Sequence, residues 1–238
     1  MKTLVLDYGA GRPLGLLRAL KEAGVDASVS SNTADVRLAD RLVLPDSFDD
    51  ERTLAKGIRP QMLEAIDAHL KRKKPVLAVG FGMLLLCSGR THQSMPAGLG
   101  FFAASVNRFD PRMVDENECP LKFPHVGFTY VVGLDRHPDF RPLLPADDKG
   151  LWLYFRHRLC APARIPFSDV AVAHHGVPFA GAVWRDNVMA LQFLPDRSGP
   201  LGVEVLKGWK AFSERKVLFE GEKVDVVVAE EPSFEEPR

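Results

Sequence analysis

A short apolar run followed by two glycines carries the strongest chemical signal in this sequence. Pro75–Val79 is apolar, Gly80 and Gly82 follow, and Met83–Cys87 is apolar again. A continuous apolar run is typical of a buried parallel strand, and glycines permit a sharp turn from that strand into a helix. In many α/β enzymes such a turn presents a nucleophile at the helix N-terminus. Here its tip is Gly80, which has no side chain with which to attack.

The cysteines and histidines offer no replacement for that nucleophile. Cys87 would lie about 10 Å along a helix from Gly80, so we expect a core residue there. Cys119 and Cys160 are widely spaced from it, which argues against a disulfide framework or a Cys-based zinc site. His174–His175 lacks metal-ligand spacing, because adjacent strand residues face opposite ways. We therefore expect no metal.

A glycine cluster near the N-terminus suggests a dinucleotide site but does not match its fingerprint. Gly9 and Gly11 are followed by Gly15, one residue later than the fingerprint requires, and Ser30–Ser31 stands where an acidic residue is needed. A tight strand-to-helix turn explains the glycines, so no cofactor is expected.

Composition limits the remaining classes of function. The 238 residues hold 31 Lys and Arg against 31 Asp and Glu, so no overall attraction to nucleic acid or an anionic membrane is expected. No stretch approaches the roughly 18 apolar residues of a membrane span. We expect a cytoplasmic protein.

The first half of the chain alternates predicted strands and helices, which indicates a parallel sheet covered by helices on both faces. Strands are expected at Thr3–Leu6, Asp26–Ser30, Leu38–Leu44 and Pro75–Val79, and helices at Leu14–Ala23 and Ile58–Arg72. Ligands bind such sheets at the carboxyl ends of the strands. Those ends are Asp7–Arg12, Pro45–Phe48 and Gly80–Gly82.

The second half reads as an antiparallel extension of that sheet. Strands are expected at Ala103–Phe109, Val126–Val132, Leu151–Cys160, Val170–Ala173, Ala180–Trp184 and Met189–Phe193. A closing helix over Gly199–Phe212 would end a domain of residues 1–212. Residues 213–238 would form a C-terminal extension, with a hairpin of Lys216–Phe219 and Val224–Val228 before an acidic tail.

Seven motifs, in order, resemble those of the class I glutamine amidotransferases. They are DYGAG (7–11), VLPDSF (43–48), the turn at Gly80, GLGFF (98–102), PHVGF (124–128), YFRHRLCAP (154–162) and NVMALQFLPDRSG (187–199). Within that family the chain is most similar to the glutaminase subunit of imidazole glycerol phosphate synthase, an enzyme of histidine biosynthesis.

The resemblance implies a mechanism whose reacting groups this chain replaces. In the family a Cys attacks the glutamine amide, a His activates the Cys and a Glu orients the His. Gly80, Leu194 and Asp196 stand at those positions. The chain is therefore expected to lack glutaminase activity and to be a pseudoenzyme.

The oxyanion hole and the substrate pocket also depart from the family pattern. The resemblance assigns one oxyanion donor to the N–H of Phe81. The family has a glycine-rich loop beside it, and this chain has Asp46 and Ser47 in that place. A carboxylate there opposes a developing oxyanion. Leu84, His157 and Arg158 occupy the substrate-binding positions, with Leu84 in place of Gln and Arg158 in place of Ser. We expect a more apolar, partly filled cleft.

The resemblance also implies a partner-facing surface around the mouth of the cleft, formed by Tyr8, Arg12, His125, Phe128 and Tyr130. Aromatic and Arg side chains have the composition of an interface hot spot. His125 could instead make a structural hydrogen bond, and Phe128 and Tyr130 could face the core. The expected partner is a (β/α)8-barrel cyclase subunit or a catalytic relative.

Three functions remain open from the sequence. The first is an inactive amidotransferase-like protein that acts by binding a synthase-type partner. The second is an enzyme of altered chemistry in the same cleft, with Asp46, Ser47, His157 and Arg158 as its polar groups. The third is a module that binds a small ligand without turnover.

Overall fold

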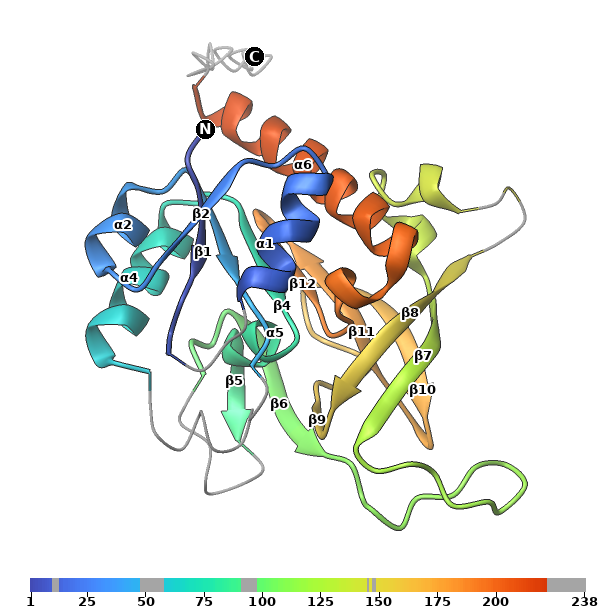
Figure 1. Cartoon of the computed structure of the whole chain (residues 1–238). Helices are drawn as coiled ribbons and strands as arrows, with labels where there is room; N and C mark the ends of the chain where they lie inside the picture. The colour runs from blue at the N-terminus through green and yellow to red at the C-terminus, as the bar shows by residue number, and fades with distance from the viewer. Residues whose placement is uncertain (10–12, 48–57, 91–97, 145, 147–148, 222–238) are drawn as a thin grey trace, which may run out of the picture.

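A nine-stranded sheet crosses the computed structural model, which describes residues 1–9, 13–47, 58–90, 98–144, 146 and 149–221. The strand order is β2-β1-β3-β4-β12-β11-β10-β7-β8 (Figure 1). In chain order the strands are β1 (Thr3–Leu6), β2 (Ala27–Ser30), β3 (Arg41–Leu44), β4 (Val76–Val79), β7 (His125–Val132), β8 (Gly150–His157), β10 (Asp169–His175), β11 (Val177–Arg185) and β12 (Val188–Leu191).

The sheet changes from parallel to antiparallel pairing at β12. Strands β2, β1, β3, β4 and β12 pair in parallel, and β11, β10, β7 and β8 continue as antiparallel neighbours. The predicted fold class, a parallel sheet with an antiparallel extension, is confirmed. The strand predicted over Met189–Phe193 joins the two parts, because β12 pairs antiparallel with β11, as expected, and also parallel with β4, which was not expected.

Helices cover both faces of the parallel part (Figure 1). Helices α1 (Pro13–Glu22) and α6 (Gly199–Gly221) contact each other on one face, and α2 (Thr33–Leu38) and α4 (Pro60–Lys71) on the other. Every residue of β1, β3, β4 and β12 is buried, as a sheet covered on both sides requires. Two apolar cores result, one on each side of the sheet.

Smaller elements complete the described part. A second, three-stranded sheet contains β5 (Cys87–Arg90), β6 (Phe102–Arg108) and β9 (Leu159–Cys160). The short helices are α5 (Phe81–Leu85), η1 (Leu134–Arg136), η2 (Arg141–Leu143) and η3 (Pro195–Arg197). No helix in the described ranges combines the length and apolar character needed to cross a bilayer.

Three local predictions were wrong. The strand expected over Leu38–Leu44 begins only at Arg41, because Leu38 ends helix α2. That helix is capped by Asn32, whose side chain accepts from the N–H of Ala34 at 2.9 Å. The apolar run Met83–Cys87 is not one helix, since α5 stops at Leu85 and β5 begins at Cys87.

The third error lies at the C-terminus. Helix α6 runs to Gly221, so Lys216–Phe219 is helical rather than one strand of a hairpin. Val224–Val228 lies outside the described residues. The domain boundary expected at residue 212 therefore falls inside a continuous helix.

Candidate functional site

The turn between β4 and α5 has the backbone of a nucleophile elbow without its side chain. Gly80 has φ 53° and ψ −112°, a region that only glycine adopts without strain. Its N–H donates to Leu191 O at 2.7 Å, which joins the turn to the end of β12. A Cβ on Gly82 would lie 2.8 Å from Leu44 Cβ, so both glycines are required by this close packing.

The carboxylate of Asp46 occupies the space above Gly80. Asp46 Oδ1 accepts a hydrogen bond from the N–H of Phe81 at 2.9 Å. A Cβ built on Gly80 would lie 2.6 Å from Asp46 Cγ and closer still to Oδ1. Asp46 Oδ2 lies 4.0 Å from Arg156 Nη2, an ion pair open to solvent on one side. The first N–H of α5 is thus bound to an internal carboxylate.

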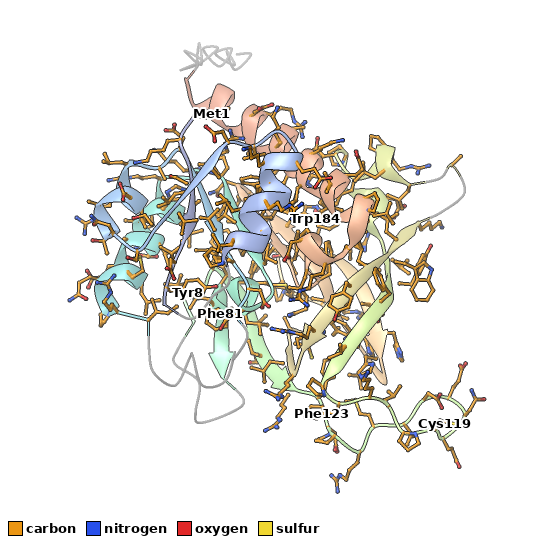
Figure 2. All side chains as sticks on the ribbon, in the orientation of Figure 1. Met1, Tyr8, Phe81, Cys119, Phe123 and Trp184 are labelled. Carbon is orange, nitrogen blue, oxygen red and sulfur yellow. The ribbon has the colours of Figure 1, made fainter. Side chains whose placement is uncertain are left out.

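Tyr8 extends this arrangement. Its hydroxyl donates to Pro45 O, and its ring meets that of Phe81 edge to face at 5.4 Å (Figure 2). Burial, followed by the nearby charge of Asp46, raises the pKa of the Tyr8 phenol well above its ordinary value. Tyr8 is therefore a neutral hydrogen-bond donor that fixes the segment before Asp46.

A cavity of about 400 Å³ opens beside Asp46. Its charged lining comes from Asp46, Arg156, Asp196 and Arg197, while the start of α1, Val79 and Leu194 supply apolar surface. The cleft was expected to be more apolar and partly filled; the cavity has apolar residues in its wall and also four charged side chains around open space. Leu194 and Leu84 are buried, each with 3% of its surface exposed.

Asp196 lies against the first turn of α1. A Cβ on Gly15 would come 2.8 Å from Asp196 Oδ2, so the missing side chain of Gly15 makes room for this carboxylate. The surrounding protein raises the pKa of Asp196 by keeping water away from part of it. Leu194, two residues earlier, is tied to the edge strand by its N–H, which donates to Tyr154 O at 2.8 Å.

Three residues predicted for this pocket, Ser47, His157 and Arg158, do not line the cavity. His157 has 6% of its surface exposed and belongs to a separate buried cluster, and Arg158 does not line the cavity. Arg156 and Arg197 line it instead. The signal for Arg156 was the alternation along β8, where His157 shares the inner face and Arg156 the outer one. Ser47 is buried with 4% exposed and is also absent from the lining.

His157 and His125 form a directed chain of hydrogen bonds between β7 and β8. His157 Nδ1 lies 2.7 Å from Leu159 O, a carbonyl that can only accept, so this nitrogen carries the proton. His157 Nε2 then accepts from His125 Nδ1 at 2.9 Å, and His125 Nε2 accepts from Thr129 Oγ1 at 2.8 Å. His175 stacks on His125 with ring centroids 4.1 Å apart. The chain requires neutral rings.

Burial away from water is the main cause of the lowered pKa values of these histidines. Burial, then the neighbouring His157 and His175, lowers the pKa of His125 to about 2. Burial lowers the pKa of His157 to about 4, opposed by its bond to Leu159. No group of three or more His, Cys, Asp or Glu among the described residues has metal-binding geometry. The cluster is a structural hydrogen-bond network, which favours the structural one of the two roles left open for His125.

Curated relatives match nearly the whole chain. The imidazole glycerol phosphate synthase subunit HisH of Deinococcus radiodurans is 32% identical over 213 residues, which cover 88% of this chain and 93% of the relative. The same subunit of Brucella suis is 31% identical over 222 residues, covering 88% of this chain and 100% of the relative. This chain belongs to the HisH family. No family model matches it.

Solved structures place the HisH-family chain on the class I glutamine amidotransferase fold. A putative GMP synthase protein of Thermoplasma acidophilum aligns with TM-score 0.65 and 17% identity, covering 93% of this chain and 98% of that one. PurLQS of Thermotoga maritima aligns with TM-score 0.63 and 15% identity, covering 91% and 98%. These likenesses agree with the observed sheet and its helical layers.

The outer face of β7 and β8 in this HisH-family chain carries a row of partly exposed aromatic rings. Phe128 meets Tyr154 edge to face at 5.5 Å, and Tyr130 meets Trp152 at 5.6 Å. Phe128 and Trp152 are 55% and 59% exposed, so these two rings do not face the core. We call these four residues the aromatic face. Arg12 lies outside the described residues.

Cys87 is a core residue, as predicted. It has 1% of its surface exposed, and its thiol lies 3.6 Å from Met83 O. Burial raises the pKa of Cys87 to about 12, so no reactive thiolate forms there at neutral pH. Cys160 is buried as well, and Cys119 is exposed.

Proposed function

We propose that this HisH-family protein does not hydrolyse glutamine and acts by binding a synthase-type partner. The observation that carries the proposal is the hydrogen bond from the Phe81 N–H to Asp46 Oδ1, directly over Gly80. In an elbow of this kind that N–H would stabilise the oxyanion of a tetrahedral intermediate. An internal carboxylate bound to it repels a second negative charge, and Gly80 supplies no nucleophile.

The neighbouring positions support the same proposal. Leu194, which the resemblance aligns with the general base, is an apolar side chain with no proton to exchange. The carboxyl of Asp196, aligned with the orienting group, lies beside Gly15 rather than next to an imidazole. Acyl transfer needs a nucleophile, a base and an oxyanion donor together. Restoring the nucleophile alone would leave the base missing and the carboxylate of Asp46 next to the oxyanion donor.

The exposed rings of the aromatic face support the proposal that a partner protein binds there. Aromatic rings half open to water at the end of a sheet have the composition of an interface centre, and their burial against another protein would gain apolar contact area. The relatives are named as subunits of imidazole glycerol phosphate synthase. We propose that the partner of this chain is a (β/α)8-barrel cyclase subunit, docked on the aromatic face.

Replacement of Phe128 or Trp152 by Ala tests the docking. Each change should weaken a complex with the cyclase subunit by about 2 kcal/mol, since hot-spot rings carry most of the binding energy. The melting temperature should change little, because both side chains are more than half exposed. Calorimetric titration measures the affinity. Phe167→Ala is the matched control, an exposed ring outside the aromatic face.

Two outcomes would contradict the docking. One is an affinity that neither change on the aromatic face alters. The other is a cyclase subunit that does not bind the wild-type chain at all.

A second function is a small-ligand binder, or an enzyme of altered chemistry, in the cavity beside Asp46. The observation that favours it is the open volume of about 400 Å³ with two carboxylates and two guanidinium groups around it. Ligand sites commonly combine such convergent polar groups with apolar walls. A small molecule retained through purification, detected by native mass spectrometry, would favour this function over the first.

A further inference from the structure

A second cavity lies at the opposite end of the sheet from the elbow. It measures about 730 Å³, within the range of small-molecule sites. Trp184, in its wall, pairs with Met189 near the start of β12, whereas Leu191 at the end of β12 pairs with Val79 beside the elbow. Figure 2 labels Trp184 beside α6, well apart from Tyr8 and Phe81. This second cavity is therefore separate from the family's cleft.

Phe167, in the wall of this cavity, follows Pro166 in a turn and has a left-handed backbone conformation and an exposed ring. Its φ is 56°, in the left-handed region that bulky side chains avoid, and 90% of its surface is exposed. No apolar core holds the ring in this position. Backbone strain of this kind concentrates at ligand sites. Phe167 presents a flat apolar surface to the cavity.

Two guanidinium groups around the cavity are held in place before any ligand arrives. Arg136 Nε donates to Gly133 O at 3.3 Å, and its Nη2 donates to Val170 O. Arg185 lies over the ring of Phe101, 4.2 Å from its centroid. These fixed orientations reduce the conformational entropy that binding would cost.

Arg215 is the third guanidinium group in the wall of this cavity. Its Nη1 donates to Asp139 Oδ1 at 2.7 Å, and Nη2 binds the other carboxylate oxygen. A guanidinium has five N–H donors, and among the described residues these hydrogen bonds use two on Arg136, one on Arg185 and two on Arg215. Donors therefore remain on each group.

Two carboxylates, Asp169 and Asp186, also line the cavity, so the place that favours an anion is next to Arg136. Arg185 pairs with Asp186, and Arg215 pairs with Asp139. Arg136, in contrast, donates only to neutral carbonyl oxygens among the described residues. Arg is the side chain that best binds planar anionic groups. Among the described residues no carboxylate is hydrogen-bonded to Arg136, so its positive charge is available to an anionic ligand.

The apolar part of the wall favours a flat ring. Trp184 and Phe212 line the cavity together with Phe167. Aromatic side chains stack against flat ligands and bury much of their surface. The ligand that matches this wall therefore carries an aromatic ring as well as the anion.

We propose that this second cavity binds a small ligand that joins a flat aromatic ring to one anionic group. The ring lies against Phe167 and Trp184. The anion, a carboxylate or a phosphate, is bound by Arg136, with the remaining donors of Arg215 beside it. The site is independent of the cleft beside Asp46 and of the aromatic face.

Calorimetric titration of the full-length protein with two probes tests this site. Adenosine 5′-monophosphate and 2-naphthoate each combine a flat ring with an anion. At least one should saturate, and the tighter of the two shows whether the site prefers a phosphate or a carboxylate ligand. Adenosine lacks the anion and inorganic phosphate lacks the ring, so each should bind at least about tenfold more weakly than the tighter probe.

The variant Phe167→Gly tests whether Phe167 contacts a ligand or has only a structural role. Glycine adopts φ 56° freely, so the melting temperature should stay or rise while the affinity for the probe falls about tenfold. Trp152→Ala, on the aromatic face, is the control and should leave the affinity unchanged. The proposal is overturned if neither probe saturates below about 10 mM, or if Phe167→Gly leaves the affinity as it was.

Discussion

Replacement of Gly80 by Ala should destabilise the protein by about 3 kcal/mol. The new methyl group would overlap the Asp46 carboxylate and displace it from the Phe81 N–H, a charge-assisted hydrogen bond that contributes about 1.5–3 kcal/mol. Alanine at φ 53° and ψ −112° adds backbone strain of about 1–3 kcal/mol. Urea unfolding measures the change in the free energy of unfolding.

A double-mutant cycle with Asp46→Ala isolates the contact. Without the carboxylate, Gly80→Ala should cost only its backbone strain, so the two changes should couple by more than about 1 kcal/mol. Gly24→Ala is the matched control, because Gly24 has φ 75° and no atom within 4 Å of its added Cβ. Its cost should be the same with and without Asp46. Strict additivity at Gly80 would show that Asp46 does not occupy that space.

Acidification should destabilise the folded protein from about pH 6.5 downward. Burial lowers the pKa of both His69 and His157 to about 4 and that of His125 to about 2 in the folded state. The unfolded chain therefore binds more protons than the folded chain below pH 6.5. Stability should fall progressively toward pH 4, by about 3 kcal/mol for each of His69 and His157.

Single substitutions assign this pH dependence to residues. His69→Gln, His125→Gln and His157→Gln should each reduce proton uptake on unfolding by about one near pH 5. His174→Gln is the control, an exposed histidine next to the cluster. The measurement is the free energy of unfolding against pH. A slope that His125→Gln and His157→Gln both leave unchanged would contradict the chain of neutral histidines between β7 and β8.

Features that depend on local pattern were predictable from the sequence. The apolar run before Gly80 gave β4 and the turn, and the proximity of Asp46 to the Phe81 N–H followed from the resemblance. Strands β1 and β2 and helices α1 and α4 lie within two residues of their predicted bounds. Each has a periodicity that packing then reinforces.

Features that depend on pairing across the sheet were not predictable. Nothing in Val188–Leu191 shows that this strand, antiparallel to β11, also pairs in parallel with β4. The pairing of His125 with His157 depends on the register of β7 and β8, which sequence periodicity does not specify. Alternation along β8 indicated the outer face for Arg156, but its position 4.0 Å from Asp46 depends on how the ends of β8 and β3 are placed relative to each other.

Ammonia release from glutamine tests the central claim most directly. The purified chain should release ammonia at the rate of buffer alone, both by itself and with a bound cyclase subunit. Gly80→Cys should not raise that rate, because the thiol has no base beside it and its Cβ would overlap the Asp46 carboxylate, whose negative charge opposes an oxyanion next to the Phe81 N–H. Turnover above the buffer rate in the wild-type chain would contradict the account.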